Sequence, residues 1–83
     1  MAYNILYKRS VAKDLSRLDK RDAKRILDKI EKELKSHPEK YPSLKGEFEG
    51  LRKLRVGDFR IIYSVIDNDV TVLRIGNRRD VYR

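Results

Sequence analysis

The spacing of apolar residues changes about halfway along this 83-residue chain, and the change restricts the folds that the chain can adopt. Up to Pro38 and Pro42, apolar residues recur every three or four positions, which is typical of one face of a helix. After residue 50, three short runs are rich in β-branched and other apolar residues and end at turn residues, as strands do. This order predicts an α+β fold in which helices pack on a sheet.

The first half of the chain predicts a short strand followed by a helix. The run YNILY at 3–7 has the composition of a strand. Ser10 is expected to cap the helix that follows, because its side chain can accept a hydrogen bond from a free backbone N–H. The apolar face of this helix contains Val11, Leu15 and Leu18.

A second helix is expected to begin after Asp19, which is placed as its N-cap. Asp22 then falls in the first turn, where a carboxylate complements the positive end of the helix dipole. The residues at helical spacing that face inward are Ala23, Ile26, Leu27, Ile30 and Leu34. The segment 36–42 ends this helix, because its two prolines cannot continue it. The two helices therefore form an αα-hairpin.

The second half predicts strands at 51–56, 59–66 and 70–75, with Gly76 after the last one. Gly57 and Asp58 join the first two strands, and Asp-Asn-Asp at 67–69 joins the last two; both connections suit two-residue hairpin turns. The expected architecture is an N-terminal strand and a two-helix hairpin packed on an antiparallel β-sheet meander. Residues 1–83 are expected to form a single domain, because a chain of this length builds one core.

The predicted first hairpin separates apolar from cationic residues. With Gly57 and Asp58 as the loop, the pairs are Val56–Phe59, Arg55–Arg60, Leu54–Ile61 and Lys53–Ile62, and paired residues share a face of the sheet. The core face then holds Leu54, Val56, Phe59, Ile61, Tyr63 and Val65, and by alternation Arg74 is expected on that side. The opposite face gathers Lys53, Arg55 and Arg60, beside Ile62 and Ser64.

Arg55 directly opposite Arg60 is a like-charge pair, which ordinarily destabilises a sheet. Cations clustered in this way favour a bound anion. The alternative is that their long stems cover apolar sheet surface while the charged ends reach water. The closing residues GNRRDVYR at 76–83 follow the strand whose end lies near Arg60, so Arg78, Arg79 and Tyr82 are expected to extend the same cationic site.

The composition limits the partners and cofactors. The formal net charge is +8, from 21 Lys and Arg against 13 Asp and Glu, which favours a polyanion or an acidic protein as partner over a merely solubilising surface. There is no cysteine and one histidine, His37, which is expected at the surface, so neither a metal nor another cofactor is expected. No membrane span or signal peptide is recognised, and a cytoplasmic protein is expected.

The motifs LKG, LRVGDFRIIYSV and GNRRDVY, in this order, resemble the RelE/ParE superfamily of toxin–antitoxin proteins, and the RelE branch in particular. The resemblance implies a toxin that is a ribosome-dependent endoribonuclease, cleaves messenger RNA in the ribosomal A site through attack of a 2′-OH, and thereby inhibits translation. It implies three partners: the ribosome, messenger RNA and a RelB-like antitoxin that neutralises the toxin. The toxin alone is expected to be monomeric and to form a hetero-oligomer with the antitoxin.

The same resemblance assigns roles to residues. It implies catalytic roles for Lys53, Arg60, Arg78 and Tyr82, and RNA or phosphate binding by Arg55, Arg79 and Arg83. The chain departs from the family pattern at Asn77, where many members have histidine, and at Leu51, where well-studied members have a catalytic lysine.

Two other functions remain open at this point. One is a ParE-like poison of DNA gyrase, which has the same fold and no nuclease activity. The other is a non-catalytic module that binds an acidic protein or a nucleic acid.

Overall fold

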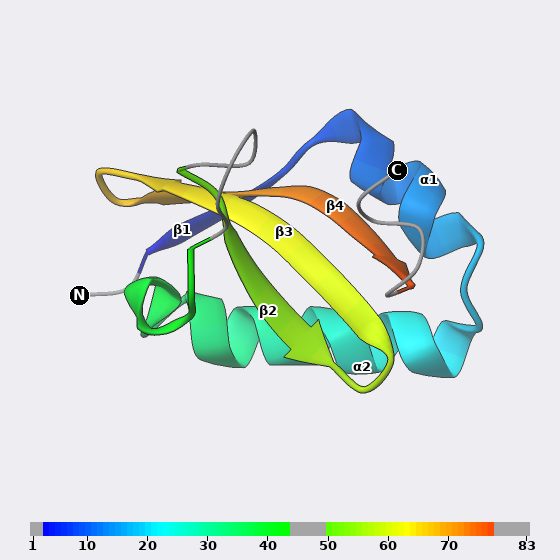
Figure 1. Cartoon of the computed structure of the whole chain (residues 1–83). Helices are drawn as coiled ribbons and strands as arrows, with labels where there is room; N and C mark the ends of the chain where they lie inside the picture. The colour runs from blue at the N-terminus through cyan, green and yellow to red at the C-terminus, as the bar shows by residue number, and fades with distance from the viewer. Residues whose placement is uncertain (1–2, 44–49, 78–83) are drawn as a thin grey trace.

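In the computed structural model, which describes residues 3–43 and 50–77, α2 lies behind a twisted four-stranded sheet and α1 lies beside β4 (Figure 1). The helices and strands follow in the order β1 (Asn4–Tyr7), α1 (Arg9–Ser16), α2 (Lys20–Lys29), a π-helical segment (Ile30–Leu34), a 3-10 turn (Pro38–Lys40), β2 (Arg52–Val56), β3 (Phe59–Ile66) and β4 (Asp69–Asn77). The predicted fold class and order of elements are confirmed. Within the described ranges, no helix has the length and apolar character that a membrane crossing requires.

The predicted hairpins set the register of β2, β3 and β4. All four pairs expected around Gly57 and Asp58 are present, including Arg55 opposite Arg60. Gly57 adopts a positive φ of 59°, which glycine tolerates better than other residues. Ile66 pairs with Asp69 across the second turn, where Asp67 has a φ of 54°. The antiparallel meander is therefore confirmed, although β4 continues past Gly76 to Asn77 instead of ending at residue 75.

β1 joins this meander in parallel with β4, so the complete sheet has the order β1-β4-β3-β2 and is mixed. The paired residues run from Asn4 opposite Asp69 to Tyr7 opposite Val72. Beyond this point β1 no longer covers the edge of β4. The sequence pattern contains no local signal for this pairing, because its partners lie more than 60 positions apart.

α1 covers the edge of β4 that β1 leaves open. The Ser10 hydroxyl donates to the Leu73 carbonyl at 3.3 Å, and the Ile75 N–H donates to the Asp14 carboxylate at 3.0 Å. The expectation that Ser10 caps α1 is therefore wrong, because the helix begins at Arg9 after Lys8 and the hydroxyl bonds to the neighbouring strand. These side chains satisfy backbone groups that an open sheet edge would expose.

The core lies between α2 and one face of the sheet. Ile26, Ile30 and Leu34 are fully buried, which confirms the predicted apolar face of the second helix. The strands contribute Leu54, Val56, Ile61, Tyr63, Val70, Val72 and Ile75, and Val11 comes from α1. Asp19 precedes α2 and Asp22 lies in its first turn, as predicted, although the Asp19 side chain makes no capping hydrogen bond.

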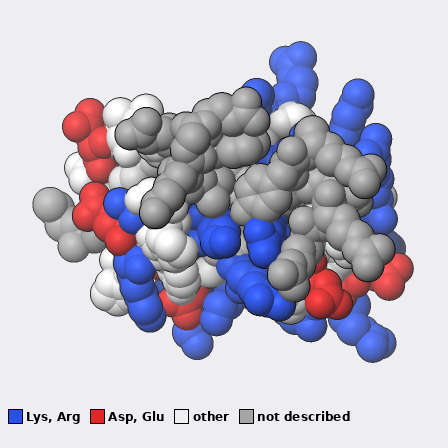
Figure 2. All heavy atoms as spheres, viewed as in Figure 1, with Lys and Arg blue, Asp and Glu red and all other residues white. Residues whose placement is uncertain are grey.

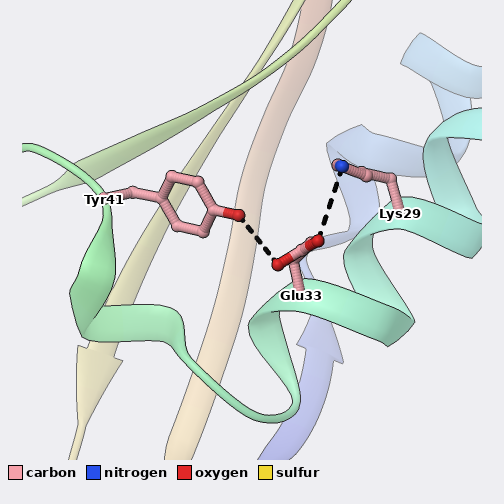
Figure 3. A network of polar contacts seen from close by, with 3 residues as sticks. All are labelled: Lys29, Glu33 and Tyr41. Carbon is pink, nitrogen blue, oxygen red and sulfur yellow. Dashed lines mark hydrogen bonds and ion pairs between the residues drawn. The ribbon is translucent and has the colours of Figure 1, made fainter.

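Polar contacts hold the segment after the helices against α2. The Tyr41 hydroxyl donates to Glu33 at 3.0 Å, and Lys29 lies 3.4 Å from the other oxygen of the same carboxylate (Figure 3). The hydrogen bond from Tyr41, together with Lys29, lowers the pKa of Glu33. Deeper in the core, the Tyr63 hydroxyl donates to the Pro38 carbonyl at 2.6 Å, and burial raises the pKa of Tyr63.

Removing the Tyr63 hydroxyl is expected to destabilise the fold. Tyr63→Phe leaves the buried Pro38 carbonyl without its donor, which lowers the free energy of unfolding by about 1–2 kcal/mol. The matched control is Tyr41→Phe, which removes a hydroxyl from a more exposed hydrogen bond and is expected to cost less. Urea denaturation of the purified variants measures both values. Equal losses in the two variants would contradict the role assigned to the buried bond.

Alkaline pH is expected to weaken the fold through Tyr7. Burial, the negative charge of Glu31 and the hydrogen bond to it raise the pKa of Tyr7 to about 12 from an ordinary value of 10.0. The folded state therefore holds this proton more tightly than the unfolded chain does. The resulting stabilisation is complete below pH about 10 and is lost as the pH rises through about 12.

Urea midpoints measured between pH 9 and 12 are expected to fall less steeply for Tyr7→Phe than for the unmodified protein, because the variant lacks this titration. Lysine side chains also titrate in this range, so the comparison between the two proteins carries the test. Parallel pH profiles would show that Tyr7 makes no contribution.

Candidate functional site

The cationic face of the sheet, defined by Lys53, Arg55 and Arg60, lies opposite α2. The neighbours of these residues in β2 and β3, Leu54 and Ile61, are buried in the core, so alternation turns the cations outward. Figure 2, drawn from the same side as Figure 1, shows Lys and Arg side chains gathered on the viewer's side of the strands. The structure thus brings together the three strand residues that the sequence predicted as site residues.

Arg55 and Arg60 form the like-charge pair expected from the turn. Residues directly opposite each other have Cβ atoms about 4.5–5.5 Å apart, so two guanidinium groups start close together. Arg55 is exposed and its Nε donates to the Gly57 carbonyl at 3.2 Å, whereas Arg60 is half-buried. A phosphate between or beside such groups would offset their mutual repulsion.

Arg74 also belongs to the cationic face, and the sequence prediction that placed it on the core side is wrong. Tyr63 pairs with Val72 while Ile62 pairs with Arg74, so Leu73 is an extra residue in β4. This β-bulge shifts the alternation of β4 by one position. Arg74 consequently shares a row with Ile62 and Lys53, and its side chain is exposed. Alternation alone misses it, because only the pairing with β3 reveals the bulge.

The alternative explanation of the cations is that their long stems cover apolar surface of the sheet. The row that contains Lys53, Ile62 and Arg74 tests this explanation. Ile62 is only 5% exposed and lies outside the main core cluster, so apolar surface exists on this face for flanking stems to cover. That covering role accounts for Lys53 and Arg74, which flank Ile62 in the register. It does not account for Arg55 opposite Arg60, because a neutral side chain would cover the sheet there without repulsion. An anion site explains the pair better.

The four remaining predicted site residues, Arg78, Arg79, Tyr82 and Arg83, lie outside the described residues. The last described pairs of β4 are Gly76 opposite Arg60 and Asn77 opposite Phe59. The chain therefore reaches residue 77 immediately beside the cationic face, as the sequence predicted. The roles of these four residues stay predictions.

The neighbouring strand residues point to the other side of the sheet or carry no charge. Arg52 donates from Nη1 to the carbonyls of Tyr41 at 2.6 Å and Glu39 at 3.3 Å, away from the cationic face. Leu51 brings no amine to the site. His37 is exposed at the far end of the helical segment, which confirms its expected surface position.

The described part of the cationic face can stabilise negative charge but has little means of moving a proton. Lys53, Arg55, Arg60 and Arg74 are cations, and among residues 3–43 and 50–77 no carboxylate or imidazole lies in the rows that carry them. Over the same residues, no group of three His, Cys, Asp or Glu side chains comes together to hold a metal ion. The arrangement therefore suits the binding of phosphates.

Comparison with known proteins yields relatives across nearly the whole chain. Residues 5–82 match the family described as the ParE toxin of type II toxin–antitoxin system, parDE. Toxin RelE of Mycobacterium tuberculosis (strain ATCC 25618 / H37Rv) is 29% identical over 84 residues, which cover 98% of this chain and 87% of that protein.

Two solved structures share the fold. A chain of the toxin–antitoxin complex RelBE2 from Mycobacterium tuberculosis matches with a TM-score of 0.89 at 24% identity, over 96% of this chain and 95% of that chain. A chain of the archaeal RelE–RelB complex from Pyrococcus horikoshii OT3 matches with a TM-score of 0.76 at 30% identity, over 98% of this chain and all of that chain. The chain therefore belongs to the ParE toxin family of type II toxin–antitoxin systems, within the RelE/ParE superfamily, and is a RelE-like toxin.

Proposed function

We propose that this toxin is a ribosome-dependent endoribonuclease that cleaves messenger RNA in the ribosomal A site and so inhibits translation. The observation that carries the proposal is the directly opposed pair Arg55 and Arg60, with Lys53 and Arg74 on the same face of the sheet. Directly opposed like charges are unfavourable in a sheet, and a bound anion would offset their repulsion. The likeness to RelE proteins supports RNA as the source of that anion.

Cleavage of RNA through its own 2′-OH defines what the site must do. The 2′-OH loses its proton and the 2′-oxygen attacks the adjacent phosphorus. The bond to the 5′-oxygen then breaks and that oxygen takes up a proton from water, which leaves a 2′,3′-cyclic phosphate and a 5′-hydroxyl. Negative charge grows on the phosphorane between these events, and preorganised cations can stabilise it. Arg60 and Lys53 are proposed for this role. Arg55 is proposed to hold a flanking phosphate.

The closing segment is proposed to complete the site. Arg78 would stabilise charge on the leaving 5′-oxygen, because a guanidinium stays protonated and is a poor proton donor. Tyr82 would stack on an unpaired base or accept the 2′-proton. A phenol with an ordinary pKa near 10 is protonated at neutral pH, so a base role requires nearby cations such as Arg78 and Arg79. Arg83 would bind the RNA backbone.

The proposed dependence on the ribosome is supported by the scarcity of groups for proton transfer among the described residues of the cationic face. A site with many cations and few groups for proton transfer gains most from a substrate that is already aligned for in-line attack, since orientation alone can supply about 7–11 kcal/mol of the barrier. The ribosome holds messenger RNA in a fixed path. We propose that it supplies this alignment and that free RNA is a poor substrate.

A RelB-like antitoxin is the proposed inhibitor. The RelBE2 complex of Mycobacterium tuberculosis and the RelE–RelB complex of Pyrococcus horikoshii support a partner of this kind. Acidic side chains of such a partner would complement the net charge of +8, and apolar ones would cover exposed residues such as Leu6 and Ile66. A hetero-oligomer of toxin and antitoxin in the cytoplasm is proposed as the inactive form.

A second function, poisoning of DNA gyrase, is favoured by one observation: residues 5–82 match the ParE toxin family. A gyrase poison of this fold needs no RNA-cleaving residues. The two functions predict different products. A nuclease that acts through the cationic face leaves cut messenger RNA, whereas a gyrase poison does not cut messenger RNA. Primer extension on messenger RNA, with a gyrase supercoiling assay in parallel, distinguishes them directly.

Loss of Arg60 is expected to abolish most of the cleavage. In a purified translation system, Arg60→Gln keeps an aliphatic stem but removes a charge proposed to stabilise the phosphorane, which should lower the cleavage rate by about 10²–10³-fold. Arg21→Gln on α2 makes the same chemical change on an exposed surface and serves as the control. Full cleavage by Arg60→Gln, or cuts by the unmodified toxin that need no ribosome, would contradict the proposal.

Replacing Arg55 is expected to separate stability from function. Arg55→Gln removes the repulsion from Arg60 and should raise the free energy of unfolding by about 0.2–1 kcal/mol. The same change is expected to reduce cleavage, because it removes a phosphate contact. Urea denaturation and primer extension measure the two effects on one preparation. If Arg55→Gln is both more stable and fully active, the pair has no role in binding the substrate.

A further inference from the structure

A pocket of about 280 Å³ lies between the end of α1, the start of β3 and the end of β4. Leu18, Phe59 and Ile75 supply apolar lining, and Arg17, Arg74 and Asp14 supply charged groups. In Figure 1 the end of β4 lies beside α1 and the connection from α1 to α2. The pocket thus opens at the same end of the sheet as Arg55 and Arg60, which flank the first hairpin turn.

The wall formed by α1 is held in place by the fold. The Asp14 carboxylate accepts a hydrogen bond from the Ile75 N–H at 3.0 Å, which ties the helix to β4. Arg17 follows the last turn of α1, and Leu18 continues from it with its backbone N–H bonded to the Leu15 carbonyl. Phe59 and Leu18 are half-buried and pack against the main core. The apolar lining therefore exists before any ligand binds.

The β-bulge connects this pocket with the cationic face. Because Leu73 is the extra residue, Arg74 sits in the row of Ile62 and Lys53, and yet it also lines the pocket. The next cationic row contains Arg55, Arg60 and Gly76, and glycine contributes no side chain to the rim that separates Arg60 from the pocket. Phe59 and Ile75 lie on the core side of the sheet, so an RNA whose phosphates lie on the cationic face would reach the pocket by passing over Gly76 near the end of β4.

We propose that this pocket binds an unpaired nucleobase of the RNA whose phosphates lie on the cationic face; the inference rests on the proposed function. Its volume falls just below the range of about 300–1,000 Å³ typical of pockets for drug-sized ligands, so it fits a smaller group such as a single base. Phe59 provides an aromatic residue on which a base can stack, and Arg17 and Arg74 can donate to base acceptors.

An acidic segment of the antitoxin is the other occupant that charge alone would allow. The apolar floor and the half-buried Phe59 favour a flat ring, which stacks, over a carboxylate, which does not. The Asp14 carboxylate also lies in the lining, where it would repel an acidic peptide but could accept from the exocyclic amine of a base. These features favour the nucleobase.

Binding of single nucleotides to the isolated toxin tests the inference. Each of the four nucleoside 5′-monophosphates, and inorganic phosphate, is titrated into the methyl-labelled full chain and followed by NMR. At least one nucleotide is expected to shift the methyl signals of Leu18 and Ile75, whereas Ile26 in the core stays unchanged. Inorganic phosphate alone is expected to leave Leu18 and Ile75 unshifted.

Variants of the charged lining residues test whether the nucleotide binds in this pocket. Arg17→Ala and Arg74→Ala are each expected to weaken nucleotide binding about tenfold, as for loss of a charged hydrogen bond. Arg9→Ala, at the other end of α1 and outside the lining, removes the same charge and should bind like the unmodified toxin. Three results would overturn the inference: no shift at Leu18, equal shifts with inorganic phosphate, or equal weakening by all three variants.

The outcome is independent of the proposed nuclease activity. Nucleotide binding is measured without ribosomes, so failure to cut messenger RNA leaves the pocket measurement intact. Conversely, if the toxin cuts RNA but no nucleotide shifts the Leu18 signal, the proposed function stands and this inference is wrong. A segment of antitoxin that shifts Leu18 where no nucleotide does would likewise assign the pocket to the antitoxin and overturn the proposal.

Discussion

The packing of α2 on one face of the sheet is the constraint that organises the rest of this protein. Ile26, Ile30 and Leu34 require an apolar surface opposite them, and alternate residues of β2 and β3 provide it. Because neighbouring strand residues point to opposite faces, every residue between them is turned away from the core. The core residues and the cationic residues therefore alternate along β2 and β3. The same burial that stabilises the fold places the charged side chains together on the opposite face.

The sequence was sufficient wherever the determining contacts are local. A two-residue turn at Gly57 and Asp58 set the register that opposes Arg55 and Arg60, and helical spacing identified the buried face of α2. Prediction failed where the partner is distant along the chain. Ser10 bonds to Leu73, 63 positions away, and Arg74 changes face because of how β4 pairs with β3. Alternation and capping preferences describe single elements and are insensitive to such partners.

One fold can serve two toxic activities because the core and the cationic face are separate sets of residues. The core cluster between the helices and the sheet contains no charged site residue. Substitutions on the outer face can change what the toxin binds without disturbing those contacts, since side chains there project into solvent. The match to the ParE toxin family and the likeness to RelE proteins are thus compatible. The proposed function rests on the four cations of the described sheet face, and the roles of the closing residues stay predictions.

The β-bulge at Leu73 also affects how β4 is held by its neighbours. It divides β4 into a part that pairs with both β1 and β3, up to Val72, and a part that pairs with β3 alone, from Arg74 to Asn77. The two parts differ in phase, and the extra residue absorbs the difference. Without that one residue Val72 and Ile75 would still both face the core, but the Leu73 carbonyl that accepts from Ser10 would be lost. The extra residue therefore serves the contact between β4 and α1 and is not needed for burial of the core.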